Sequence, residues 1–84
     1  MDIYYQAVQK FGIPTQVTKA LEELSELSVA ILHYYSGKVS VDAFADEIAD
    51  VEIMCSQLRH IIGNEIVTAK KTAKLERLNR LINE

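Results

Sequence analysis

The chain contains few residues that break helices, cross-link a fold or mark a membrane segment. Its 84 residues include one proline, three glycines, one cysteine and no tryptophan. The single cysteine, Cys55, cannot form an internal disulfide, which is consistent with a reducing compartment, and we expect it to pack as a small core side chain. No apolar run approaches the ~18 residues that a membrane helix needs, and the start "MDIYYQAVQKF" lacks the pattern of a signal peptide. We therefore expect a cytoplasmic protein with no membrane partner.

Basic charge is also scarce. The formal net charge is −3 at pH 7. Nucleic-acid-binding domains usually carry a basic excess, so this balance argues against a nucleic-acid partner and against a helix-turn-helix protein. The acidic side chains concentrate between positions 22 and 52, whereas the basic ones collect from Arg59 onward.

Glycine and proline divide the chain into segments. Gly12 and Pro14 follow a short first segment, Gly37 ends the second, and Gly63 ends the third. Between these residues the apolar side chains recur at helical spacing, and strict alternation is absent. The pattern predicts a single all-α domain over residues 1–84, a bundle of about four helices. The expected helices cover residues 2–11, 15–36, 41–62 and 64–83.

The helix ends and connections predict how the helices pack. Ser40 or Asp42 would cap the third helix, and Asn64 would cap the fourth. The connection "HYYSGKVSV" between the second and third helices is short. These two helices should therefore pack as antiparallel neighbours, a central hairpin.

Two pairs of carboxylates fall on the apolar sides of these two helices. On a helical wheel, Glu23 and Glu26 lie at the edge of the second helix's apolar face, while Glu22 points toward water. Glu47 falls inside the apolar face of the third helix, and Asp50 borders it. The apolar face of the second helix is formed by Ala20, Leu24, Leu27 and Ile31. That of the third is formed by Phe44, Val51, Cys55, Leu58 and Ile62.

Packing the two faces together brings the four carboxylates into proximity. They would repel one another strongly in a low dielectric unless protonated or neutralised by cations. Oxygen ligands without nearby histidine or cysteine favour a hard cation such as Mg²⁺, Mn²⁺ or Ca²⁺ over zinc. The alternative is a set of salt bridges beside the core, with Lys19, Arg59 or the C-terminal basic residues as partners.

The order and spacing of these carboxylates resemble a known family. Glu22-Glu23-x-x-Glu26 is followed, after a gap, by Glu47-x-x-Asp50. This pattern resembles the EExxE and ExxD motifs of the MazG-like all-α nucleoside triphosphate pyrophosphohydrolases. The flanking stretches "LEELSELSVAI" and "DEIADVEIM" are similar to that family's second and third helices, and "KLERLNRLI" resembles the tail of its short, phage-type members.

The resemblance implies a MazG-like fold and a specific reaction. A nucleoside triphosphate would be hydrolysed between its α and β phosphates, giving a monophosphate and pyrophosphate. Glu23, Glu26, Glu47 and Asp50 would hold Mg²⁺, with Mn²⁺ as a substitute. Glu26, with Glu23 beside it, is the candidate to accept a proton from the attacking water.

Further residues are candidates to contact such a substrate. Lys70, Lys74 and Arg77 share one face of the last helix and could bind phosphate groups, or they could form a solvated basic surface. His33 lies on the same side of its helix as Glu26 and could approach the substrate.

The small size of the chain predicts assembly. A short helical hairpin cannot easily cover both of its sides, and Val29 and Ile53 suggest additional contacts, so we expect a homo-oligomer. MazG-like enzymes are dimers or tetramers, and the resemblance implies a homodimer or homotetramer whose second chain completes the nucleotide pocket. A non-catalytic helical module that binds nucleotide or protein is the alternative function.

Overall fold

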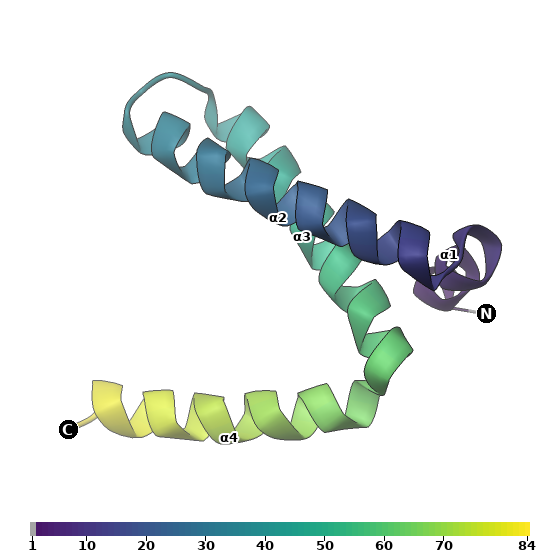
Figure 1. Cartoon of the computed structure of the whole chain (residues 1–84). Coiled ribbons are helices and arrows are strands. Elements are labelled where there is room, and N and C mark those ends of the chain that lie inside the picture. The colour runs from purple at the N-terminus through teal and green to yellow at the C-terminus, as the bar shows by residue number, and fades with distance from the viewer. Residues whose placement is uncertain (1) are drawn as a thin grey trace.

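The computed structural model describes residues 2–84, and over this range it contains helices and no strands (Figure 1). The four helices are α1 (Ile3–Phe11), α2 (Ile13–Tyr35), α3 (Val41–Ile62) and α4 (Asn64–Ile82). The prediction of an all-α chain is confirmed. Within the described range, none of these helices is long and apolar enough to cross a membrane.

Local interactions fix where the helices begin. The backbone N–H of Ala43 donates to Ser40 Oγ at 3.1 Å, so Ser40, and not Asp42, caps α3. The prediction that Asn64 caps α4 is wrong, because Gly63 occupies the cap position and Asn64 is the first helical residue. Gly12 and Gly63 have φ values of 87° and 117°, which side chains disfavour, and these two glycines form the tight joints that begin α2 and α4.

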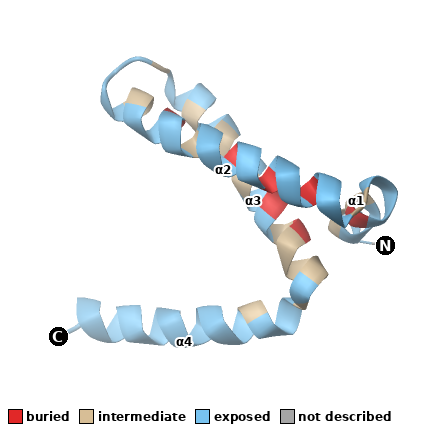
Figure 2. Ribbon diagram, in the orientation of Figure 1, coloured by how far each residue is buried: buried red, intermediate tan, exposed pale blue. Residues whose placement is uncertain are grey.

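The helices α2 and α3 form an antiparallel hairpin, and the other two helices add to one end of it. Helix α1 packs against both α2 and α3, whereas α4 contacts only α3 among the helices. Figure 1 shows α4 turning away from the hairpin after α3 ends. Figure 2 shows that the buried positions lie on the hairpin and α1, while almost all of α4 is exposed.

The interior formed by the hairpin and α1 is small and partly polar. Its buried apolar residues are Val8, Ala20, Ala30 and Met54. Its buried polar residues are Gln16, Glu23 and Gln57. A long side chain such as glutamine or glutamate is rarely buried without a partner, so this composition needs an explanation beyond packing.

The apolar faces expected from the wheel are only partly buried. Leu24, Ile31 and Ile62 are exposed, and so is Cys55, which therefore does not pack as a core side chain. The physical reason is that two helices in contact bury one narrow stripe each. The apolar sector of α2 and α3 is wider than that stripe, and acidic residues occupy part of it.

Side-chain hydrogen bonds hold the angle between α3 and α4. Arg59 donates from Nε to Asn64 Oδ1 at 2.7 Å and from Nη2 to Thr68 Oγ1. Both acceptors lie in the first turns of α4. One side chain of α3 therefore bonds two residues of the next helix across the Gly63 joint.

A side-chain hydrogen bond between Asp2 and His60 ties the N-terminal helix to α3. Asp2 accepts the backbone N–H of Tyr4 at 2.8 Å and so caps α1, while its other oxygen lies 3.0 Å from His60 Nε2. The rings of Tyr4 and Tyr5 lie beside the His60 ring. The bonds to Tyr4 and His60 lower the pKa of Asp2, the backbone bond contributing most.

Candidate metal centre

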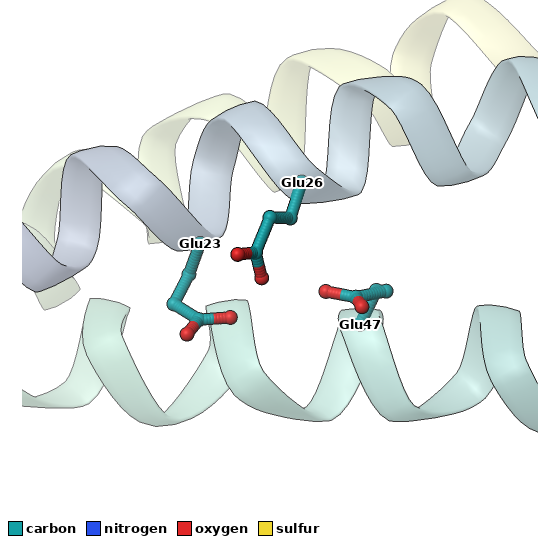
Figure 3. Close-up of side chains that lie close together, drawn as sticks. All are labelled: Glu23, Glu26 and Glu47. Atoms are coloured by element: carbon teal, nitrogen blue, oxygen red, sulfur yellow. The ribbon is translucent and has the colours of Figure 1, made fainter.

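Three carboxylates meet between the two helices of the hairpin. Glu23 and Glu26 extend from α2 and Glu47 extends from α3, and one oxygen of each lies within 4.8 Å of the others (Figure 3). Glu23 and Glu26 are three residues apart, so they share one side of α2. The antiparallel packing of α3 then places Glu47 opposite them.

The cluster contains acceptor oxygens that the chain leaves without partners. The side chain of Glu23 is only 11% exposed, and its Oε1 lies 3.5 Å from Lys19 Nζ. Within the described chain, neither Glu23 Oε2 nor Glu47 Oε2 has a hydrogen-bond partner, although both atoms are buried. An unpaired buried carboxylate oxygen is costly, and a bound cation is one way to compensate for that cost.

The electrostatics of Glu23 agree with this geometry. Burial raises the pKa of Glu23, and the charges of Glu26 and Asp50 raise it further. Lys19 acts in the opposite direction. The site thus concentrates negative charge that the protein compensates only in part.

Two other acidic residues of the motifs lie outside the group of three. Asp50 is exposed, but it is close enough for its charge to affect Glu23. The structure thus brings three of the four predicted ligands together, with the fourth beside them. Glu22 is exposed on α2, as the wheel predicts.

Salt bridges account for only a small part of the cluster. Lys19 pairs with Glu23, as the alternative interpretation expects. Arg59 instead bonds Asn64 and Thr68. Over residues 2–84, neither Glu26 nor Glu47 forms an ion pair.

A groove opens directly beside the carboxylates. It has a volume of about 410 Å³, and Glu26 and Glu47 form part of its wall. The rest of its lining is mainly apolar and comes from Ser25, Val29, Ala30, His33, Val39 and Ala43. The sequence analysis identified His33 but did not predict the groove. Val39, which forms part of the groove wall, belongs to the turn between α2 and α3, where helical periodicity does not predict the position of a side chain.

The predicted phosphate-binding residues lie elsewhere in the chain. Lys70, Lys74 and Arg77 are all exposed on α4. Since α4 packs only against α3 and turns away from the hairpin, a single chain does not bring these side chains to the carboxylates.

Comparison of this chain with protein-family models, with curated proteins and with solved structures gives no match. The functional interpretation therefore depends on the geometry of the carboxylate cluster, on the groove beside it, and on the motif resemblance.

Proposed function

We propose that this chain is a Mg²⁺-dependent nucleoside triphosphate pyrophosphohydrolase with a MazG-like fold. The observation that supports it most is the convergence of Glu23, Glu26 and Glu47, two of which carry buried oxygens without partners. The spacing of these residues also matches the motif that suggested the function.

The donor set fits a hard divalent cation. All three side chains offer carboxylate oxygens, and Asp50 can add a fourth. Mg²⁺ is bound through carboxylates and keeps positions for water and for phosphate oxygens. Such an ion supplies charge neutralisation for the phosphates and lowers the pKa of a coordinated water.

Glu23 and Glu26 have different positions in the cluster and are suited to different roles. Glu23 is buried and holds its position, whereas Glu26 is more exposed and lies at both the cluster and the groove. Glu26 is therefore placed to accept a proton. Water adds to the α-phosphorus, the bond from that phosphorus to the α–β bridging oxygen breaks, and pyrophosphate leaves as Glu26 takes the proton. The apolar groove would receive the nucleoside.

The test is pyrophosphate release from a panel of ribo- and deoxyribonucleoside triphosphates, with and without Mg²⁺. Glu47→Gln should reduce turnover by at least about 100-fold, because it removes a charge at the centre of the cluster. Glu22→Gln is the matched control, since Glu22 is a neighbouring exposed glutamate that does not belong to the group of three carboxylates. It should leave turnover within about twofold of the unmodified chain.

Two results would contradict the proposal. One is the absence of turnover with every nucleotide from a folded, Mg²⁺-loaded protein, which would favour the non-catalytic binding module. The other is an equal loss of turnover in the Glu22 and Glu47 variants, which would show that activity does not depend specifically on the carboxylate cluster.

A further inference from the structure

Lys19 is the basic side chain that reaches the carboxylate cluster. Its Nζ lies 3.5 Å from Glu23 Oε1, and over residues 2–84 no other lysine or arginine forms an ion pair. Lys19 precedes Glu23 by four positions on α2, which places it one turn before the glutamate. Glu26 lies three positions beyond Glu23. The lysine therefore approaches Glu23 from the end of the cluster that is nearer the start of α2.

The protein encloses the two members of this ion pair to different extents. The side chain of Glu23 is 11% exposed, whereas that of Lys19 is 55% exposed. The distance of 3.5 Å is also longer than the ~2.8 Å of a strong charge-assisted hydrogen bond. An exposed lysine keeps much of its hydration and loses little when it separates from a carboxylate. Burial thus fixes Glu23, and Lys19 is the partner that can leave.

Open space lies beside Lys19. It lines a surface pocket of about 450 Å³ near the start of α2. The other residues of this pocket are Pro14, Thr15, Thr18 and Glu22. In the described chain, the ion pair of Lys19 is with Glu23 alone. A lysine that separates from Glu23 therefore enters solvent without having to break a second ion pair.

Lys19 compensates the charge of the cluster from one end only. Burial and then the charges of Glu26 and Asp50 raise the pKa of Glu23, while Lys19 lowers it. The lysine pairs with Glu23 Oε1, but the buried Oε2 atoms of Glu23 and Glu47 remain without a hydrogen-bond partner within residues 2–84. A divalent cation among the three carboxylates would use the carboxylate with which Lys19 is paired. Two cations therefore compete for Glu23.

We propose that Lys19 is a tethered cation, which pairs with Glu23 in the metal-free chain and must separate from Glu23 before a divalent ion binds. Lys19 is a positioning residue with two opposite effects. It stabilises the metal-free cluster, because it offsets part of the repulsion among the carboxylates. It weakens metal binding, because its positive charge repels a second cation and occupies one of the ligands. The inference rests on the metal centre of the proposed function, but not on hydrolysis.

The first test is the affinity for Mn²⁺, measured from the spin-resonance signal of the free ion. Lys19→Met should bind Mn²⁺ at least about threefold more tightly than the unmodified chain. Lys19→Arg keeps the charge and should stay within about twofold of the unmodified affinity. Lys10→Met is the matched control, because Lys10 is also an exposed lysine but forms no ion pair within residues 2–84. Its affinity should also stay within about twofold.

The second test separates the tethered cation from an ordinary structural ion pair. Without metal, Lys19→Met should melt below the unmodified chain, because Glu23 loses its partner. With saturating Mg²⁺ the difference should narrow or vanish, because Lys19 no longer pairs with Glu23 in the metal-bound chain. A purely structural ion pair would give the same loss with and without the ion. Circular dichroism of each variant, with Lys19→Gln as a second neutral substitution, shows that the helices are retained.

The outcomes distinguish this inference from the proposed function. An unmodified chain that binds no Mn²⁺ would overturn the metal centre and the tethered cation together. If the unmodified chain binds Mn²⁺ and Glu47→Gln abolishes that binding, the metal centre stands. Unchanged or weaker Mn²⁺ binding by Lys19→Met would then overturn the tethered cation alone, as would an equal loss of melting temperature with and without Mg²⁺.

Discussion

Glu23 combines features that rarely occur together in a structural residue. It is a buried carboxylate in the interior of a hairpin, with a second and a third carboxylate beside it and only one lysine nearby. The general cost of burying charge explains why sequence reasoning could select it: a glutamate on an apolar face is unusual without a partner. The lysine alone leaves one of its oxygens unpaired.

Removing this charge should stabilise the protein in the absence of metal. Glu23→Gln eliminates repulsion from Glu26 and Asp50 and lowers the cost of burial. We therefore expect its melting temperature without Mg²⁺ to rise above that of the unmodified chain. Under the proposed function, the rise produced by adding Mg²⁺ should disappear, because the proposed Mg²⁺ site includes the Glu23 carboxylate.

Thermal unfolding with and without Mg²⁺ measures both effects, with Glu22→Gln as the control that should respond to Mg²⁺ like the unmodified chain. A Glu23 variant less stable than the unmodified chain without metal would indicate that the glutamate has a structural role instead.

Asp2 should give the stability of the chain a dependence on acidic pH. Its pKa is held below the ordinary value of 3.8, chiefly by the backbone N–H of Tyr4 and also by His60. A carboxyl whose folded pKa is depressed stabilises the fold above its unfolded pKa and loses that contribution as pH falls through the folded value. Urea unfolding of the unmodified chain and Asp2→Ala should therefore differ most at neutral pH and converge below about pH 4. A constant difference down to the lowest pH would exclude ionisation of Asp2 as the cause.

At the scale of the elements, the helix boundaries were predictable and the rotation of the helices was not. Glycines, proline and Ser40 act locally, so their positions predict where helices begin and end. Which side of α2 faces α3 depends instead on tertiary packing. The apolar sector of α2 is wide enough to allow two different rotations of the helix against α3. In the structure, the rotation buries Glu23 and leaves Leu24 exposed. Three of the four predicted ligand residues lie together, as expected, because they share the side of each helix that became the interior.

The direction of α4 could not be predicted, because it depends on hydrogen bonds across a joint. Arg59 donates to Asn64 and Thr68, and in the described chain α4 has no other helix to pack against than α3. Arg59→Ala should therefore destabilise the α3–α4 joint by about 1 kcal/mol. Hydrogen exchange at the amides of α4 should accelerate, with little change in α2.

The control for this prediction is Lys71→Ala. Lys71 lines a surface pocket together with Arg59, but within residues 2–84 its side chain makes no hydrogen bond or ion pair. Equal exchange in the two variants would show that the bonds from Arg59 do not determine the stability of α4.

At the scale of the whole molecule, the hairpin and α4 differ in charge and in how far they are packed. Between positions 22 and 52 there are eight acidic residues and one basic residue, whereas positions 64–84 carry five basic and three acidic residues. The basic helix projects from the hairpin, and its apolar side chains Leu75, Leu78 and Ile82 are exposed. An isolated helix of this length is marginally stable in water and depends on packing against other helices. Helix α4 packs only against α3 among the described helices, so it has little of that stabilisation.

If the predicted phosphate-binding residues act on the carboxylate site, they must therefore come from another copy of the chain. Complementation tests this directly. Glu47→Gln and Arg77→Gln should each lose turnover alone, the first through the cluster and the second through phosphate binding. When the two variants are unfolded, mixed equally and refolded together, about one site in four should combine intact carboxylates with an intact α4 from another copy. Turnover should then recover to about a quarter of that of the unmodified chain. The refolded mixture must first be shown to contain both chains in one assembly. If turnover then fails to recover, Arg77 acts on the carboxylates of its own chain. Helix α4 could reach those carboxylates only by leaving the orientation that the hydrogen bonds of Arg59 hold.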